Sequence, residues 1–475
     1  MAASEAAPFA KTGGLADVLG SLPQALLAEG HEVAVAIPRY GSIPLHNAIR
    51  VAESLKLPLG ACDIWRLDHN GVACYLVDSP ALYDRPGIYS DRGADYPDNY
   101  LRFAFFCQAV LAVVRTLFQA DILHLHDWQS ALCAPYLRTR FRLHPAFVNL
   151  KTVFTIHNLE HQGRFGPKVF PSLGLDPWLM TPGFLEFFGD VNFMKGGIVF
   201  SDAITTVSPQ YAEEIQTLEF GFGLDGLLRE RRARLHGIIN GVDYTEWNPE
   251  TDPHLAAHYS STSLPGKRAC KKDLLQEMLL PVENLDRPVL GIVSRFARQK
   301  GFDLFMDIAY ELLNDDVCLV ALGSGESRYE EFFRDLASTF PARVACQIGY
   351  NNRLAHKIEA GADMFLMPSV FEPCGLNQIY SLRYGTVPVV RATGGLEDTV
   401  DADTGFKFQG YWPHDLLLAI RAALDEFRSD HSGWVKRMTT GMTRDFSWTA
   451  SAAQYSALYG NLLREYNMEN ALGPR

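Results

Sequence analysis

Residues 288–301 read PVLGIVSRFARQKG, an apolar run that ends in a basic turn. The run predicts a buried strand, and the segment Phe302–Leu313 that follows has helical periodicity. An apolar strand that leads directly into a helix is typical of a parallel sheet with helices on both faces. Arg295 and Lys300 are therefore expected at the carboxyl end of a strand, the edge at which such sheets bind ligands.

The same alternation of short apolar strands and longer helical segments runs through nearly the whole chain. The expected strands are Val33–Ile37, Val72–Val77, Asp121–Leu125, Lys151–Ile156, Ala203–Val207, Leu235–Ile239, Pro288–Ser294, Val317–Leu322, Val344–Ile348, Asp363–Met367, Val387–Arg391 and Gly405–Phe408. The expected helices include Leu15–Glu29, Phe302–Leu313, Ser327–Phe340 and Asn351–Ala360. Two such series predict two doubly wound α/β domains.

A stretch with little periodicity separates the two series. It runs from Asp243 to about Lys267, is rich in Pro, Ser, Thr and His, and is interpreted as the hinge region. We expect an N-terminal domain of residues 1–243 and a C-terminal domain of residues 244–447. A last helix, within residues 448–475, can complete the first domain, although the sequence alone also allows it to pack on the second.

Composition and charge exclude several classes of protein. The 475 residues are 47% hydrophobic and 21% charged, as in globular proteins, and their formal net charge of −12 argues against a nucleic-acid or anionic-membrane partner. The longest apolar stretch, Phe103–Val114, is too short to span a bilayer and predicts a buried helix. Eight cysteines without a C-x-x-C pair indicate reduced core thiols, and the sequence shows no targeting signal, so we expect a cytoplasmic protein.

A Gly-Gly turn occurs twice, each time ahead of a predicted helix. Residues 12–18 read TGGLADV and residues 393–400 read TGGLEDTV. Glycine permits a tight turn and a close backbone approach, and the N–H groups of a helix N-terminus favour an anion. Both turns could therefore bind phosphate, but ordinary helix starts would have the same sequence.

Two motifs at strand ends in the second half carry chemical groups. Arg295 and Lys300 offer a planar fork and a point charge, which together could hold a pyrophosphate; a solvated basic loop is the alternative. Residues 371–376 read FEPCGL, in which Glu372 could accept hydrogen bonds from sugar hydroxyls. Cys374 has no basic neighbour in the sequence to activate it, so a packed thiol is favoured over a nucleophile.

In the first half of the chain, two successive predicted strands end in polar residues. Residues 124–128 read HLHDW and residues 155–158 read TIHN. His126, Asp127 and His157 could be a metal site or an acid–base set, but no further ligand spacing supports a metal. We therefore interpret them as lining a substrate site. Residues 240–243, NGVD, are only a turn as a sequence signal, although their place at the domain junction allows a substrate contact.

In this order and spacing, the motifs resemble bacterial glycogen synthases and plant starch synthases, glycosyltransferase family five, over nearly the whole chain. They stand at Lys11–Val18, His124–Trp128, Thr155–Leu159, Asn240–Asp243, Ser294–Gly301, Phe371–Leu376 and Thr393–Leu396. The resemblance implies a GT-B fold, in which two Rossmann-like domains face each other across a deep cleft, with the donor mainly on the C-terminal one. It implies a retaining transfer of glucose from ADP-glucose to the non-reducing end of an α-1,4-glucan such as glycogen.

The resemblance also implies roles for individual residues. The expected catalytic residues are Arg295, Lys300, Glu372 and His157. The expected substrate-binding residues are Lys11, Gly13 and Gly14 at the pyrophosphate, Asn240, Cys374 and Gly375 at the sugar, Tyr350 at the nucleobase, Asp17 and Asp127 as acceptor-side or site-shaping carboxylates, and Thr393 and Gly394 in the second turn. Tyr380 stands where many retaining GT-B enzymes carry a second Glu, and the residues MAASE at the start predict a short first strand.

The implied reaction uses neither a metal nor a cofactor, so fixed cations and a helix dipole would stabilise the departing diphosphate. Front-face attack is favoured, with the leaving phosphate taking the proton of the acceptor. A double displacement would need a carboxylate beneath the anomeric carbon, and no residue identifies itself as that group. The sequence does not discriminate ADP-glucose from UDP-glucose.

The sequence bears on two other functions. A non-catalytic glucan- or nucleotide-sugar-binding protein of the same fold would be favoured by loss of Arg295, Lys300 or Glu372, and all three are present. A nicotinamide oxidoreductase is discarded, because the nearest glycine fingerprint, Gly323–Arg328, ends in Arg where Gly or Ala is needed.

Overall fold

The computed structural model describes residues 1–471, with side chains as far as Glu465, so residues 472–475 of the expected C-terminal segment lie outside the described residues. The chain divides into two compact units. Unit 1 contains Met1–Val207, Ala212–Gly241 and the C-terminal helix from Trp448, and unit 2 contains Ser208–Tyr211 and Val242–Ser447. Within the described range, no helix combines the length and apolar character needed to cross a membrane.

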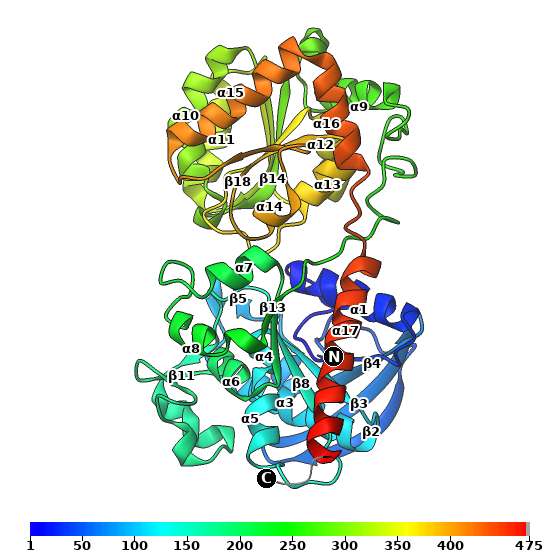
Figure 1. Ribbon diagram of the computed structural model, residues 1–475, viewed down its shortest axis with the longest axis vertical. Helices are drawn as coiled ribbons and strands as arrows, with labels where there is room; N and C mark the ends of the chain where they lie inside the picture. Colours follow the sequence, from blue (N-terminus) through cyan, green and yellow to red (C-terminus); the bar gives the residue numbers. More distant parts are fainter. Residues whose placement is uncertain (472–475) are drawn as a thin grey trace. The chain divides into compact units, whose positions relative to one another are not determined.

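Unit 2 is built on a six-stranded parallel sheet (Figure 1). Its strands are β14 (Val289–Phe296), β15 (Cys318–Gly325), β16 (Val344–Ile348), β17 (Met364–Met367), β18 (Val387–Arg391) and β19 (Phe406–Phe408). Their order in the sheet is β16-β15-β14-β17-β18-β19. The chain builds outward from β14 in one direction, then returns to β14 and builds in the other. The sheet is therefore doubly wound, with its topological switch point between β14 and β17.

Helices cover both faces of this sheet (Figure 1). They are α9 (Pro265–Glu277), α10 (Phe302–Leu312), α11 (Ser327–Thr339), α12 (Asn352–Gly361), α13 (Asn377–Arg383), α14 (Gly394–Thr399), α15 (Pro413–Ser429) and α16 (His431–Met442). Alternate residues of a strand point to opposite faces. Leu319 and Ala321 of β15 accordingly pack in one core with Phe305 of α10, whereas Val320 packs in a second core with Ile358 of α12. Both faces of the sheet are therefore buried in apolar cores, which explains the continuous apolar runs in the sequence.

Unit 1 has a larger, mixed sheet. Strands β7 (Ile122–His126), β8 (Lys151–Ile156), β12 (Ala203–Thr206) and β13 (Leu235–Gly237) are parallel, in the order β13-β12-β8-β7. A second group, β1 (Ala34–Pro38), β2 (Ile49–Leu57), β3 (Gly60–His69) and β4 (Val72–Asp78), has the order β1-β4-β3-β2. Ala2 bridges β1 at Ala36 and β7 at Leu125, so the first residues join the two groups as a very short strand.

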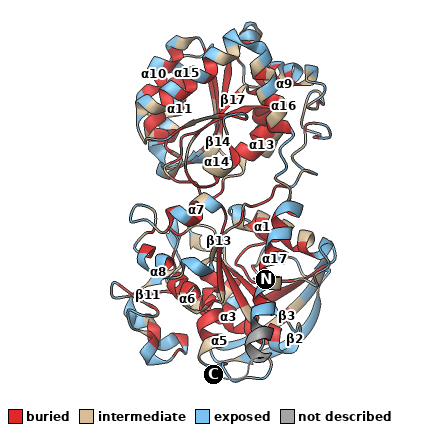
Figure 2. Cartoon of the chain, viewed as in Figure 1, coloured by how far each residue is buried: buried red, intermediate tan, exposed pale blue. Residues whose placement is uncertain are grey.

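The twelve expected strands are confirmed to within a few residues, but the antiparallel pair β2–β3 was not predicted. Most residues of β2 are at least partly exposed, and Figure 2 shows this edge of the sheet mainly in the exposed colour. A strand without a buried face gives no apolar run in the sequence, so the rule that found the parallel strands missed it.

Helices of unit 1 complete the layers. The principal ones are α1 (Gly14–Ala28), α3 (Asn99–Thr116) and α17 (Trp448–Ala471). Shorter elements are α2 (Pro80–Tyr83), α4 (Asp127–Ala131), α5 (Cys133–Arg138), α6 (Phe193–Phe200), α7 (Pro209–Glu214), α8 (Asp225–Glu230), β5 (Ser90–Asp91), β6 (Ala94–Asp95), β9 (Arg164–Phe165), β10 (Glu186–Phe187) and β11 (Asp190–Asn192). The expected buried helix at Phe103–Val114 is confirmed as part of α3.

The C-terminal helix packs on unit 1, which the sequence alone did not decide. The hydroxyl of Ser451 in α17 donates to the carbonyl of Ile239 at 2.6 Å, and Tyr459 lies 2.7 Å from a ring nitrogen of His124. All eight cysteines are free, and seven of them are buried, as expected of core thiols.

The stretch interpreted as the hinge region, 243–267, belongs to unit 2 and is anchored within it by side-chain contacts. The ring of Trp247 stacks on His356 with a centroid distance of 3.8 Å and on Tyr380 at 3.9 Å. The carboxylate of Asp252 is buried and accepts a hydrogen bond from Tyr384 at 2.6 Å. The segment lacks periodicity because single aromatic and charged anchors hold it, with no continuous apolar face.

Candidate functional site

An ion pair lies at the switch point of the unit 2 sheet. The Nζ of Lys300, just after β14, is 2.6 Å from the Oε2 of Glu372, just after β17, and the two side chains are 18% and 7% exposed. The hydroxyl of Ser369 donates to the same carboxylate oxygen at 3.0 Å. Ligands of doubly wound sheets bind at this position. The structure therefore brings together two residues that the sequence placed on separate motifs.

Backbone contacts hold the two loops of this pair against each other. The amide of Val370 donates to the carbonyl of Gln299 at 2.8 Å, and the side chain of Gln299 donates to the carbonyl of Phe371 at 3.3 Å. Lys300 and Glu372 are thus attached to loops with fixed spacing, which lowers the conformational entropy that a bound ligand would have to remove.

The second Gly-Gly turn packs directly behind Glu372. The amide of Gly395 donates to the carbonyl of Glu372 at 3.0 Å. Gly394 has φ +46°, and a Cβ on it would lie 2.0 Å from that same carbonyl oxygen. Thr393 and Cys374 are buried in this contact. The turn supports the Glu372 loop, and the thiol of Cys374 is packed, as the sequence favoured. Gly375 lies in the same loop with φ +71°.

Two further residues of the predicted donor site are exposed in unit 2. Arg295 is exposed at the end of β14, and its guanidinium has no partner among the side chains that the structure describes. Tyr350 follows β16 and is 85% exposed, with its hydroxyl 3.2 Å from Asn352 Oδ1. The guanidinium of Arg295 and the ring of Tyr350 are therefore both accessible to a ligand. Neither side chain forms a hydrogen bond or ion pair with Lys300 or Glu372.

The first Gly-Gly turn in unit 1 is open. Lys11 pairs with Asp17 at 2.6 Å, with side-chain exposures of 53% and 34%, so two residues predicted for different roles contact each other. A Cβ on Gly13 or Gly14 would have no atom within 4 Å. The turn begins α1 from an exposed position at which nothing in the described fold requires a missing side chain.

Sequence reasoning missed the carboxylate that holds this turn. Glu5 is 3% exposed and accepts hydrogen bonds from the amide of Thr12, from the hydroxyl of Thr12 at 2.7 Å, and from the hydroxyl of Tyr89. No spacing rule connects these three residues, because Glu5 follows the very short strand at Ala2 and Tyr89 comes from a distant loop. These hydrogen bonds to Glu5 hold the Lys11–Gly14 turn in place.

The polar residues after β7 and β8 come together as predicted. The carboxylate of Asp127 accepts from the amide of His157 at 2.8 Å, and the Nδ1 of His126 lies 3.0 Å from the Nε2 of His157. Burial raises the pKa of Asp127 to about 7 and lowers the pKa of His157 to about 3. His157 is therefore neutral near pH 7 and is available as a hydrogen-bonding group, not as a cation.

Asn240 and the possibility of a metal complete the predicted set. The side chain of Asn240 is 8% exposed, and its Oδ1 has no hydrogen-bond partner in the described part of the chain. A buried polar atom without a partner marks a position where a ligand can supply one. Within residues 1–465, no three His, Cys, Asp or Glu side chains are grouped so that they could hold a metal ion.

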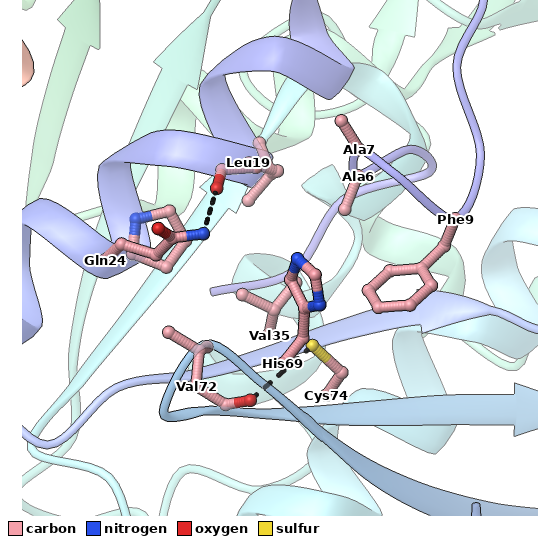
Figure 3. A pocket seen from close by; sticks show the side chains of 11 residues that line it. Ala6, Ala7, Phe9, Leu19, Gln24, Val35, His69, Val72 and Cys74 are labelled. Carbon is pink, nitrogen blue, oxygen red and sulfur yellow. Dashed lines mark hydrogen bonds between the residues drawn. The ribbon is translucent and has the colours of Figure 1, made fainter. Parts of the chain in front are cut away.

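A small hollow beside α1 is separate from these residues (Figure 3). Phe9, His69 and Cys74 are among the side chains that line it, and its volume of about 10 Å³ has room for roughly one water molecule. It is too small for a glucosyl unit, so it is not a substrate site.

Comparison with known proteins identifies the class. Residues 1–230 match the family described as "Starch synthase catalytic domain", and residues 281–432 match "Glycosyl transferases group 1". The catalytic domain of starch synthase IV from Arabidopsis thaliana, solved with ADP and acarbose bound, has a TM-score of 0.87 at 32% identity over 98% of both chains. Sucrose-phosphate synthase from Thermosynechococcus elongatus, at 18% identity and covering 97% of this chain and 96% of its own, shares the fold with a TM-score of 0.61. Fold and motifs thus define a GT-B-type glycosyltransferase, as predicted.

Relatives in bacteria give the family. The glycogen synthase of Koribacter versatilis (strain Ellin345) is 50% identical over 473 residues, which cover 96% of each chain. The glycogen synthase of Bacillus cereus (strain Q1) is 43% identical over 97% of this chain and 99% of its own. The chain belongs to the glycogen synthase family.

Proposed function

We propose that the protein transfers glucose from ADP-glucose to the non-reducing end of an α-1,4-glucan such as glycogen, with retention of anomeric configuration. The observation that carries the proposal is the partly buried Lys300–Glu372 ion pair at the switch point of unit 2. The ADP in the starch synthase IV structure supports an adenine nucleotide as the leaving group. The free cysteines support a reducing compartment, the cytoplasm.

Unit 2 is the proposed donor side. Lys300 and Arg295 would face the pyrophosphate and stabilise the charge that develops on the departing ADP. Lys300 and Ser369 both bind Oε2 of Glu372, whereas Oε1 has no hydrogen bond from the side chains described. That oxygen can accept from a sugar hydroxyl. Tyr350 would stack on the base, and the backbone of Cys374, Gly375 and the Thr393–Gly394 turn would line the sugar site.

Unit 1, completed by the C-terminal helix, is the proposed acceptor side. The open turn of Lys11, Gly13 and Gly14 would approach the pyrophosphate with its backbone N–H groups at the start of α1. His157 and Asn240 would hydrogen-bond the transferred sugar. Asp17 and Asp127 would shape the acceptor site.

In the proposed reaction the glucosyl–phosphate bond breaks first. The incoming glucan hydroxyl then attacks from the same face and gives its proton to the leaving phosphate. His157 does not take that proton, since burial holds the pKa of its ring at about 3. Fixed cations would do the electrostatic work, so the rate depends on their placement and not on a titrating side chain.

The test is incorporation of labelled glucose into glycogen from ADP-glucose and from UDP-glucose in parallel. We expect rapid chain growth from ADP-glucose and an α-linked product. Tight glucan binding without chain growth from any nucleotide sugar in a panel would overturn the proposal in favour of a non-catalytic binding protein. Faster growth from UDP-glucose would overturn the choice of nucleobase alone.

A further inference from the structure

His126, the last residue of β7, is fully buried beside His157, and none of the proposed substrate contacts uses it. Its Nδ1 lies 3.0 Å from the Nε2 of His157. Its other ring nitrogen, Nε2, is buried and has no hydrogen-bond partner in the part of the chain that the structure describes. One nitrogen of this buried imidazole thus contacts a residue of the predicted substrate site, and the other has no partner. Buried polar atoms without a partner are uncommon in proteins and often mark a functional position.

The ring of His126 is held in place. It stacks on His124 with a centroid distance of 4.1 Å and an interplanar angle of 30°. Both nitrogens of His124 are themselves engaged, by the hydroxyl of Tyr459 at 2.7 Å and by the hydroxyl of Thr155 at 2.5 Å. His126 therefore cannot turn its ring over without disturbing a network that reaches the C-terminal helix.

The contact between the two imidazoles contains a single proton. Burial lowers the pKa of His126 well below its usual range and lowers that of His157 to about 3, so both rings are neutral near pH 7. A neutral imidazole carries one N–H and one bare nitrogen. One ring donates to the other, and the direction fixes the tautomer of both.

The two directions differ in what they leave buried. If His157 donated from Nε2, the proton of His126 would sit on its own Nε2, as a buried N–H without an acceptor. Orphaned N–H groups of this kind are rare in proteins because they lose their hydrogen bond to water and gain none. If His126 donates from Nδ1, its buried Nε2 carries no proton and is only an unpaired acceptor. A buried acceptor without a partner costs less free energy than a buried N–H without one.

We infer that His126 is a positioning residue, which donates its Nδ1–H to the Nε2 of His157 and thereby keeps the proton of His157 on Nδ1. The ring of His157 is half-buried, and its Nδ1 has no partner among the described residues. It therefore offers an N–H to an acceptor oxygen, such as a hydroxyl of the transferred sugar. Only this last contact rests on the proposed function; the tautomer does not.

The direct test is an NMR measurement on the full chain labelled with ¹⁵N-histidine, near pH 7.5. Long-range ¹H–¹⁵N spectra distinguish the two neutral tautomers, and a His157→Gln variant identifies the signals of His157 by their disappearance. We expect His157 to be protonated on Nδ1 and bare on Nε2. A proton on Nε2, or a charged ring, would overturn the inference, and this arm needs no change at His126.

Two substitutions then test the cause. His126→Leu removes the hydrogen-bond donor, and His126→Asn keeps an N–H close to the position of Nδ1. We expect the leucine variant to move the proton of His157 to Nε2 and to lower kcat about tenfold with little change in KM, as for one lost neutral hydrogen bond in the transition state. The asparagine variant should keep the tautomer and stay within about threefold of wild type.

The control is His414→Asn, the same exchange at an exposed histidine of α15 in unit 2, which should change neither readout. An unchanged tautomer in the leucine variant would overturn the inference even if activity fell. If the leucine variant does not fold, loss of the Nδ1–H tautomer in the asparagine variant would overturn it. Wild-type protein that shows the expected tautomer but transfers no glucose would contradict the proposed function and leave the role of His126 intact.

Discussion

The two Gly-Gly turns have nearly the same sequence and opposite surroundings. At Gly394 a Cβ would lie 2.0 Å from the carbonyl of Glu372, and at Gly395 it would lie 2.0 Å from the carbonyl of Cys374. At Gly13 and Gly14 a Cβ would meet nothing within 4 Å. The fold itself requires glycine in the second turn, whereas in the first turn it leaves room for a side chain.

The difference separates two reasons for a glycine. In unit 2 the turn is a structural support behind Glu372, and the residues that face a ligand are on the loops it supports. In unit 1 the turn is exposed, and hydrogen bonds from Thr12 to Glu5 hold it in place. Because the fold leaves room for a side chain at both glycines, we attribute them to the close approach of another molecule to the backbone. Substitutions can separate the two reasons, because one should change stability and the other binding.

The largest effect is expected at the cation that the second turn helps to place. Lys300→Ala should lower kcat on the order of 10²–10³-fold, because it removes a preorganised charge and leaves the buried carboxylate of Glu372 without its partner. Initial rates of glucose incorporation measure this. Lys300→Arg keeps the charge and serves as the matched control. Near-wild-type transfer by the alanine variant would refute the assigned role.

Next comes the packed turn. Gly394→Ala should lower the free energy of unfolding by about 2–3 kcal/mol, since the new Cβ collides with backbone and the residue must keep a positive φ. Urea unfolding followed by circular dichroism measures it. A loss below about 0.5 kcal/mol, the range of ordinary surface changes, would show that the contact behind Glu372 is not tight.

The open turn should respond in the opposite way. Gly13→Ala is expected to change the free energy of unfolding by less than about 0.5 kcal/mol, as for a surface site, and to weaken ADP binding about tenfold. Isothermal titration with ADP gives the second value. If the variant binds ADP as well as wild type does, ADP does not approach this backbone. The open turn would then have no role in donor binding.

The smallest effect concerns the carboxyl beside His157. Burial raises the pKa of Asp127 to about 7, so the folded protein keeps a proton there that the unfolded chain releases from about pH 4 upward. Wild type should therefore lose about 1 kcal/mol of stability relative to Asp127→Asn between pH 5 and pH 6. Urea unfolding of both proteins at the two pH values measures it. A stability difference that grows in favour of wild type with rising pH would contradict the shift.

Periodicity predicted the fold well where the strands are buried on both faces. Every expected strand is present, and α17 begins at the expected Trp448. The pair β2–β3 was missed because neither strand has a continuous apolar run. The stretch around Trp247 shows little periodicity because a few separate side chains anchor it. Neither feature leaves a repeated signal in the sequence.

The site was predictable as a set of motifs but not as a set of contacts. Strand-end motifs identified Lys300 and Glu372, and only the strand order, with β14 beside β17, makes them partners. Glu5 could not be found in the same way, because its role depends on hydrogen bonds to Thr12 that no local pattern encodes. The motif did identify His126, but not its contact with His157.

The central claim is that the diphosphate of the donor is bound at the switch point of unit 2. A crystal structure of the protein with ADP tests it most directly. Phosphate oxygens are expected within hydrogen-bonding distance of the Nζ of Lys300 and of the guanidinium of Arg295. ADP bound elsewhere, with the Lys300–Glu372 pair undisturbed and no phosphate near it, would rule out this donor site.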